Sequence, residues 1–394
     1  FDLGYRYDKV KHKPRYSGYP EVPRGIITGL WVPYPYNPYD GIHGYYTPYG
    51  EENYQQNLKF LLRQKEYQSG SYALGLNLDP SEWTRIQLKA SRGFRAPTSD
   101  EAYMTFKHPD FSIRPNIDLE AEIARTKEIA FTLYQEKSRI TFNVFKTNYK
   151  KFIDLDFLGN LQVVDQQVPY PFYQNVNRDN AKVHGFEINA HLELGDVAEY
   201  LDGFRLGYKY SRQKGKMSCA NNGSKSNDPS AGCGKGEEVP MNAIQPPTSV
   251  YNIGYSTPGD KYGIDLFITD VAAKKREDTY NMYWKSQIDR IDPKTGGHRP
   301  ADVVNSKPVT DNTRGWRSGD YTVVDVIAYA KPHKNFNFGL GVYNLTNAKY
   351  ITWDSARSIR AFGTVNMINQ ATGAGIGRFY APRRNFRFNW EITF

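Results

Sequence analysis

One short stretch of the chain, residues 91–119, contains residue types that suggest metal chemistry; its sequence is SRGFRAPTSDEAYMTFKHPDFSIRPNIDL. A single imidazole, His108, stands between the aromatic residues Phe106 and Phe111. Neutral imidazole is a good metal ligand that still exchanges protons and metal near neutral pH. The alternative is a loop histidine that is only solvated or hydrogen-bonded, and the residue types alone leave both interpretations open.

A strand-like run ends at the start of this stretch, at Phe94-Arg95-Ala96-Pro97. The guanidinium of Arg95 can make charge-assisted hydrogen bonds to the carboxylates of a ligand. It can equally pair with a carboxylate of the protein itself, such as Glu101 or Glu128, while Pro97 turns the strand into a loop. The sequence is therefore compatible with Arg95 contacting a ligand and with Arg95 pairing within the protein.

Catalysis has little support in the sequence. There is no nucleophile elbow, glycine-rich phosphate loop or metal motif, and the Asp154/Asp156 pair is most simply explained as solvated charge. We therefore expect the protein not to be an enzyme. The net charge is +9, but the basic residues are spread along the chain, so a nucleic-acid partner is not expected either.

The chain has two cysteines, Cys219 and Cys233, which flank the polar segment ANNGSKSNDPSAG. This spacing matches no metal site, and no histidine is adjacent. A loop-closing disulfide between them is predicted, which indicates an oxidising compartment outside the cytoplasm.

The elements that must position these residues are predicted to be β-strands. In the C-terminal segment RNFRFNWEITF, apolar and polar side chains alternate, and the same pattern recurs in RIQLKAS (85–91) and GFRLGYKYS (203–211). There is no apolar run long enough for a transmembrane helix. The predicted strands lie near 1–9, 69–78, 84–94, 123–135, 139–151, 183–194, 203–213, 247–257, 261–272, 320–330, 335–347 and 384–394.

The connections between these strands alternate between short and long. Such alternation is improbable in a compact soluble domain but typical of a bacterial outer-membrane barrel, which has short periplasmic turns and long extracellular loops. We therefore predict an all-β fold, a transmembrane antiparallel β-barrel with long extracellular loops. The long connections are 10–68, 95–122, 152–182, 214–246, 273–319 and 348–383.

Several motifs resemble those of the haem- and haemoglobin-transporting TonB-dependent outer-membrane receptors. Phe94-Arg95-Ala96-Pro97 matches the FRAP box of that family. Arg114-Pro115-Asn116-Ile117 matches the two middle residues of its Asn-Pro-Asn-Leu box, and its outer two residues depart from it. Towards the C-terminus, GVYNLTNAKY and RFYAPRRNFRFNWEITF look most like the haemoglobin and haemoglobin–haptoglobin receptors.

The resemblance implies a 22-stranded barrel closed around an N-terminal plug domain. Residues 1–394 would then be the C-terminal part of the barrel domain, about twelve strands, and the plug domain, the TonB box and the early strands would be absent. Localisation in the bacterial outer membrane, in contact with its lipid, and coupling to the TonB complex through the missing N-terminal segment follow from the same resemblance.

In receptors of this family that carry both boxes, a histidine between them is a haem ligand, and His108 falls in that interval. The resemblance thus makes His108 the candidate ligand of haem iron, with Phe106 covering the porphyrin and Arg95 pairing with a propionate. Tyr103 is a second candidate, because tyrosine also ligates haem iron. Haem would be a transported ligand, taken from haemoglobin or haemoglobin–haptoglobin, rather than a permanent cofactor.

Other ligands remain open, namely transferrin, lactoferrin or a ferric siderophore for a receptor of the same class. A passive porin or an adhesin-like barrel is the alternative from a different class. Two aromatic tracts, 29–50 and 167–177, are rich in tyrosine and proline. Tyrosine is enriched at protein interfaces, so these tracts are predicted to contact a large protein ligand. The alternative is that they only pack against neighbouring loops.

Overall fold

The structure is a computed structural model. It describes residues 1–15, 31–33, 44–46, 59, 61–104, 106–108, 111–161, 170–219, 237–279, 318–358 and 375–393.

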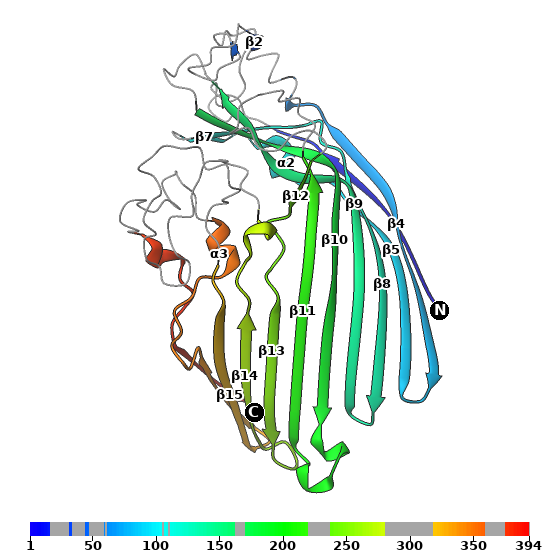
Figure 1. The fold of residues 1–394 in the computed structure, drawn as a ribbon, viewed down its shortest axis with the longest axis vertical. Coiled ribbons are helices and arrows are strands. Elements are labelled where there is room, and N and C mark those ends of the chain that lie inside the picture. The colour runs from blue at the N-terminus through cyan, green and yellow to red at the C-terminus, as the bar shows by residue number, and fades with distance from the viewer. Residues whose placement is uncertain are drawn as a thin grey trace.

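One large antiparallel sheet dominates the molecule (Figure 1), and its strands follow one another in chain order. Each of the twelve predicted strands is present, so the all-β barrel-type fold is confirmed. The strands are β1 (Asp2–His12), β4 (Lys65–Ser81), β5 (Thr84–Arg95), β8 (Glu122–Gln135), β9 (Ser138–Leu161), β10 (Tyr170–Glu193), β11 (Phe204–Ser218), β13 (Thr248–Ser256), β14 (Tyr262–Val271), β15 (Tyr321–His333), β16 (Phe336–Tyr343) and β17 (Asn385–Ile392).

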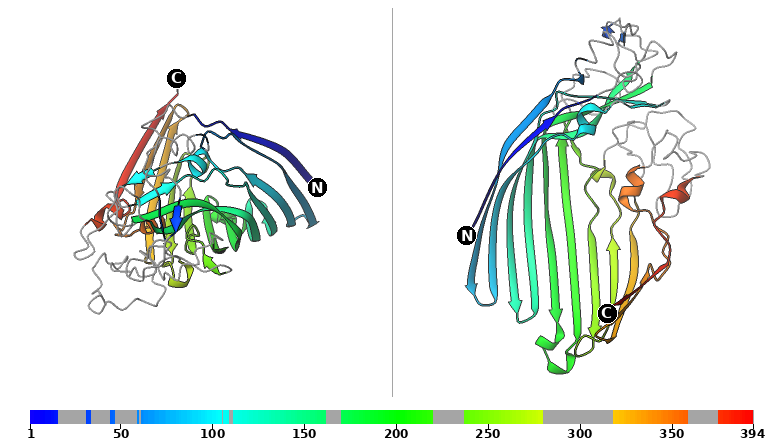
Figure 2. Two further views of the ribbon diagram at one scale, coloured as in Figure 1. Left: turned by 90° about the horizontal axis from the view of Figure 1, so that it is seen from above. Right: turned by 180° about the vertical axis from the view of Figure 1, so that it is seen from behind.

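The sheet is curved but open. In the strand order β1 and β17 are the two ends, and within the described residues they do not pair with each other. Figure 2 shows the two chain ends on separate edges of the curved sheet. A closed barrel of larger strand number would require further strands between these two edges.

Smaller elements lie in the connections. β2 (Trp31–Pro33) pairs with β3 (Gly44–Tyr46), β6 (Phe106–His108) pairs with β7 (Phe111–Arg114), and β12 (Glu238–Pro240) pairs with β11. No helix among the described residues is long and apolar enough to cross a membrane. The short helices are α2 (Ser99–Tyr103), α3 (Trp353–Ser358), η1 (Leu194–Asp196), η2 (Glu199–Leu201), η3 (Arg276–Asp278) and η5 (Ile376–Phe379).

One face of the sheet carries large exposed apolar side chains, as the alternation predicts. On β8 and β9, Ile129, Phe131, Phe142 and Val144 are 58%, 40%, 43% and 45% exposed. Register places them side by side, with Phe131 opposite Phe142 and Ile129 opposite Val144. An outward apolar band of this kind faces lipid in membrane barrels, and we call this side the outer face.

At one end of the sheet the strands are joined by short turns, and two of these turns are linked by Asp196 of η1. Its carboxylate accepts hydrogen bonds from the backbone of Lys137 at 3.2 Å and of Ser138 at 2.9 Å. The Ser138 hydroxyl donates a third at 2.6 Å. The β8–β9 and β10–β11 turns therefore form one rim.

The opposite end carries the long connections and the buried apolar clusters. Two strands extend much further into this end than predicted, because β9 and β10 are each 24 residues long and occupy most of the predicted 152–182 loop. A membrane needs only about 9–11 residues of strand. The alternation of apolar and polar side chains indicates only as much strand as a membrane requires, so the pattern could not reveal that the hairpin continues.

A buried ion pair stabilises this extension. Arg178 on β10 is fully buried and donates to Asp154 at 2.9 Å and to Asp156 at 3.2 Å on β9. The two aspartates, interpreted from sequence as solvated charge, are instead the partners of a buried guanidinium. A buried cation requires such partners, since an isolated charge would be costly to desolvate.

Candidate functional site

The Phe94–Pro97 box lies where β5 leaves the sheet. Pairing with β8 continues up to Arg95, which is opposite Glu122. The chain then turns through the buried Pro97 into α2, whose first turn is closed by a capping box. In this box the Thr98 hydroxyl accepts from the Glu101 backbone at 3.2 Å, and Glu101 accepts from the Thr98 backbone at 2.7 Å. The Thr-Ser-Asp-Glu sequence thus starts a helix at a fixed place after the strand.

The guanidinium of Arg95 joins α2 to the sheet. It donates to both carboxylate oxygens of Glu101, at 3.0 and 2.8 Å, and to Glu122 on β8 at 3.1 Å. Glu122 also accepts from the backbone of Ile153 at 3.1 Å. The predicted pairing with Glu101 is confirmed, whereas the alternative partner Glu128 is replaced by Glu122, because Glu122 is the residue opposite Arg95 in the β5–β8 register.

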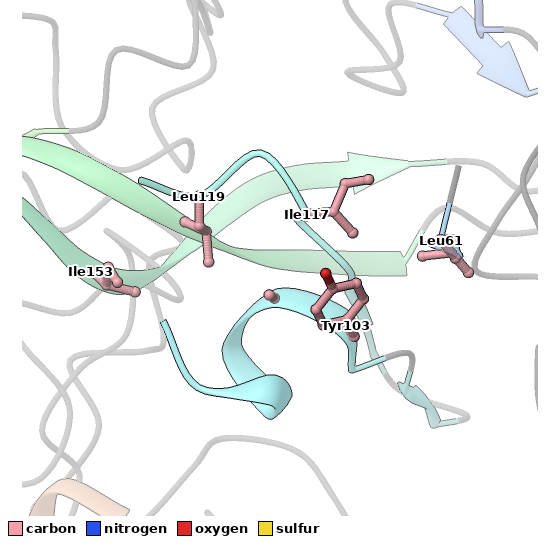
Figure 3. Packing of buried hydrophobic residues seen from close by; sticks show 6 residues of the cluster. Leu61, Tyr103, Ile117, Leu119 and Ile153 are labelled. Atoms are coloured by element: carbon pink, nitrogen blue, oxygen red, sulfur yellow. The ribbon is translucent and has the colours of Figure 1, made fainter. Parts of the chain in front are cut away.

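Tyr103, the last residue of α2, points into a packed cluster (Figure 3). Its side chain is 8% exposed, and its hydroxyl donates to the carbonyl of Arg63 at 3.2 Å. Burial raises the pKa of the hydroxyl above its ordinary value, which disfavours the phenolate form that ligates iron. The geometry supports a packing role for Tyr103. The cluster comprises Leu61, Ala102, Tyr103, Ile117, Leu119 and Ile153.

The second box, Arg114–Ile117, fastens the returning chain to α2 and to β10. The backbone N–H of Asn116 donates to the carbonyl of Ala102 at 2.9 Å, and its side-chain amide donates to the carbonyl of Asn175 at 2.8 Å. Asn175 in turn donates to the carbonyl of Glu101 at 3.0 Å. Ile117 completes the cluster at 3% exposed. The two boxes therefore meet at α2.

Two polar residues of β10, Asn175 and Gln174, take part in this junction and were not identified from the sequence. The amide of Gln174 donates to the carbonyl of Pro115 at 2.8 Å. Gln174 and Asn175 lie within the predicted 152–182 loop, so no strand periodicity indicated where their side chains point. The only available signal was the polar run QNVN inside an aromatic tract.

His108 lies between the two boxes, at the far end of β6. β6 pairs with β7, and the backbone of His108 is opposite that of Phe111. β7 in turn runs parallel to β10, with Ser112 opposite Phe172. Phe106, two residues before His108, is 40% exposed. The His108 side chain lies outside the description, so its role as an iron ligand stays a prediction.

The loop between β5 and β8 has two parts with different roles: a base at α2 and the second box, and a tip at β6 and β7. At the base, Arg95, Tyr103 and the second box are engaged with one another and with the sheet. The tip is the short β6–β7 hairpin, whose backbone includes His108 and which carries the exposed ring of Phe106. The two parts together present one histidine on a supported loop.

The other predicted residues fall on different parts of the structure. Cys219 is buried at 2% exposure in a cluster with Met217 and Val239. No free cysteine occurs among the described residues, and Cys233 lies outside them, so the Cys219–Cys233 disulfide stays a prediction. The described residues of the aromatic tract 29–50 form the β2–β3 pair, with Trp31 opposite Tyr46.

An antiparallel sheet with an apolar outer face, a rim of short turns and long connections at the other end is the sheet of an outer-membrane-type β-barrel. The chain belongs to the family described as TonB dependent receptor-like, beta-barrel, which matches residues 1–345.

Several of its relatives carry the names of haemoglobin-binding proteins. A probable hemoglobin and hemoglobin-haptoglobin-binding protein 1 of Haemophilus influenzae is 50% identical over 100% of this chain and 39% of its own length. The hemoglobin and hemoglobin-haptoglobin-binding protein B of the same species is 49% identical over 100% of the chain and 39% of that protein. The chain thus spans well under half the length of these relatives.

Solved structures show the same fold at low sequence identity. A ferric enterobactin receptor of Pseudomonas aeruginosa matches with a TM-score of 0.53 and 17% identity over 84% of this chain and 42% of that one. The FrpB iron transporter of Neisseria meningitidis matches with a TM-score of 0.51 and 14% identity, over 84% and 40% of the two chains. These similarities are to the barrel architecture.

Proposed function

We propose that this chain is part of an outer-membrane receptor that binds haemoglobin or haemoglobin–haptoglobin and takes up haem as a source of iron. The observation that carries the proposal is the 50% identity, over the whole chain, to a probable haemoglobin- and haemoglobin–haptoglobin-binding protein. The plug domain, the remaining strands and the contact with the TonB complex would lie in the part of the receptor that this chain does not span. TonB would supply the energy for uptake.

Within this receptor, His108 is proposed as a ligand of haem iron, with Phe106 covering the porphyrin. The proposal is supported by the position of β6 and β7, which extend from a base tied to both β5 and β10. Arg95 and Tyr103 are proposed to position this loop, because their polar groups contact Glu101, Glu122 and the Arg63 carbonyl. This assignment replaces direct contact with haem for these two residues.

The test uses the intact receptor, with haemoglobin binding and the haem absorption spectrum measured for wild type and for His108→Ala. We expect both proteins to bind haemoglobin, because the loops supply a large interface, and only the wild type to show the spectrum of ligated haem. His184→Ala is the matched control, since His184 lies on the outer face of β10, away from this loop.

A His108→Ala receptor with an unchanged spectrum and unchanged uptake would exclude His108 as the ligand and leave the haemoglobin receptor. A wild-type receptor that fails to bind haemoglobin but captures transferrin, lactoferrin or a ferric siderophore would replace the ligand. Passive permeation without any of these ligands would indicate a porin.

A further inference from the structure

Directly beyond the apolar band, the outer face of four adjacent strands becomes basic. One register row runs Ile129–Val144–Phe186 across β8, β9 and β10. The next row towards the long connections is Lys127–Lys146–His184–Lys214, and the row after that is Arg125–Asn148–Lys182–Lys216. Since alternate residues share a face, all of these side chains point to the lipid side. Lys150 lies one row further along, opposite Ile123, and Arg212 lies at the border of the apolar band, opposite Phe186. We call this surface the basic belt: Arg125, Lys127, Lys146, Lys150, Lys182, Arg212, Lys214 and Lys216.

The belt is exposed and poorly neutralised. Its side chains are all in the exposed class. Within the part of the chain that the structure describes, only Lys182 has a carboxylate partner, Glu238 at 3.1 Å. On the other face, by contrast, Arg205 is paired with Asp265 at 2.6 Å. Among the described residues, the belt thus concentrates positive charge of which only Lys182 has a counter-charge.

The arrangement is unfavourable for the isolated sheet. Lys127 is directly opposite Lys146, and Lys182 is directly opposite Lys216. Like charges in directly opposed positions on neighbouring strands destabilise a sheet. A counter-anion supplied from outside would remove this repulsion, and the position of the belt determines which anion can reach it.

The belt borders the apolar band on the side of the long connections, which is the extracellular side of an outer-membrane barrel. Lipid headgroups of the outer leaflet lie at this height, and basic residues near anionic headgroups bind them through their phosphates. The belt is also local. Beyond β11 the two basic rows do not continue on β13, because the β11–β13 pairing ends at Ser211 opposite Thr248. The outermost complete outer-face row there, Tyr210–Ser249–Asp270–Thr322, contains no cation.

We propose that the basic belt is a binding surface for the phosphate groups of an anionic lipid of the outer leaflet. Its acyl chains would lie against the apolar rows below, around Ile129 and Val144. The proposal concerns a site separate from the haem-binding loop, and it rests on the outer-membrane location but not on the identity of the transported ligand.

The test compares wild type with Lys127→Gln/Lys146→Gln/Lys214→Gln, which removes the complete cationic row. The matched control is Lys89→Gln/Lys209→Gln/Lys261→Gln, which changes the net charge equally: Lys89 and Lys209 lie on the other face of β5 and β11, and Lys261 lies in a short turn. Intact receptors in phosphatidylcholine nanodiscs are titrated with bisphosphorylated lipid A, monophosphoryl lipid A or inorganic phosphate. Folding is checked by heat-modifiable migration, and haemoglobin binding is measured in parallel.

We expect the row variant to lose affinity for bisphosphorylated lipid A roughly a hundredfold, from about fivefold per lysine, and the control to bind as wild type does. Wild type should bind monophosphoryl lipid A more weakly. Equal binding by the row variant and wild type would overturn the proposal. Inorganic phosphate that binds as tightly as the lipid would overturn the lipid assignment.

A second measurement needs no variant. Acylation of Lys146 and Lys214 in wild type should be slower with bisphosphorylated lipid A in the nanodisc than without it, whereas acylation of Lys89 and Lys209 should be unchanged. Equal protection of both pairs would contradict a local site. Since haemoglobin binding is followed separately, failure of lipid binding leaves the proposed receptor function intact, and failure of haemoglobin binding leaves the lipid site intact.

Discussion

At the scale of single residues, Arg95 has two alternative roles from the sequence: contact with a ligand carboxylate or pairing with a carboxylate of the protein. Its guanidinium bridges Glu101 and Glu122, and Glu122 is only 8% exposed. Arg95→Ala would leave a mostly buried carboxylate without its cation, which costs about 1–3 kcal/mol, because the Arg95 side chain is itself 41% exposed and water can reach the site. We therefore expect this variant to destabilise α2 and the β6–β7 loop. Faster hydrogen exchange of the amides of 98–119 would show the effect.

A double variant distinguishes positioning from ligand contact. Arg95→Met/Glu122→Gln removes the cation and the buried charge together. Hydrogen exchange should therefore return most of the way to the wild-type rate. Haem binding, which we expect Arg95→Ala to weaken by loosening the loop, should recover as well. Haem binding that stays lost while exchange recovers would instead mean that Arg95 contacts a haem propionate directly.

Residue chemistry was predictable where a local rule applied. The Thr98–Glu101 spacing and Pro97 fix the start of α2, and the pairing of Arg95 with Glu101 follows from their proximity in sequence. The partners Glu122 and Asn175 were not predictable, because each depends on the register of a distant strand. The engagement of Tyr103 depends likewise on a carbonyl forty residues earlier, that of Arg63.

At the scale of elements, strand positions in the membrane were predicted well because lipid imposes alternation on them. The same rule could not locate the upper halves of β9 and β10, where the environment is aqueous and the pairing is fixed by Arg178 and its two aspartates. The minor strands β6, β7 and β12 were not predicted either, since each of their pairings covers only three residues.

Lys274 joins three of the long connections to one another. Its side chain is 4% exposed, its ammonium donates to the carbonyl of Ile244 at 2.5 Å, and it lies 4.9 Å from the centre of the Trp353 ring. The indole N–H donates to the carbonyl of Asn242 at 2.6 Å. Residues 242–244, Lys274 and α3 therefore form one tie between the β11–β13, β14–β15 and β16–β17 connections.

The free energy of unfolding should rise at alkaline pH, because Lys274 then loses the charge that is costly to bury. Burial, helped by the Arg357 charge and opposed by Asp278, lowers the pKa of Lys274 from 10.5 to about 8. The unfolded state thus binds more protons between pH 8 and 10.5, so the free energy of unfolding rises with pH across this window. The cost of burying the charge is fully present below pH 8, and at most about 3 kcal/mol is recovered.

Two measurements check this behaviour. The rate of Lys274 acylation as a function of pH, followed by peptide mass spectrometry, gives its pKa directly. Thermal melting followed by tryptophan fluorescence should shift upward between pH 8 and 10.5 in wild type. In Lys274→Met, which keeps the packing but cannot titrate, that shift should be absent. A Lys274 that titrates at its ordinary pKa would show that the tie is open to water.

At the scale of the whole molecule, the open sheet makes folding dependent on chain outside these residues. β1 and β17 end the strand order, and each therefore presents an edge of backbone donors and acceptors that another strand must satisfy, particularly in lipid. Twelve strands whose curvature belongs to a wider barrel do not close without a change in tilt and register, because strand number and diameter are linked.

We therefore expect the 394-residue chain, expressed alone, not to acquire the heat-modifiable migration of a closed barrel. Supplying the N-terminal part of the receptor as a separate chain should restore it, because the missing strands would pair with β1 and β17. Disulfide trapping between a cysteine introduced at Gln68 of β4, as a marker of correct folding, and one at Lys9, its partner on β1, should succeed only in the reconstituted sample. If the chain alone migrates as a folded barrel and shows this crosslink, β1 and β17 pair directly and the twelve strands form a complete small barrel.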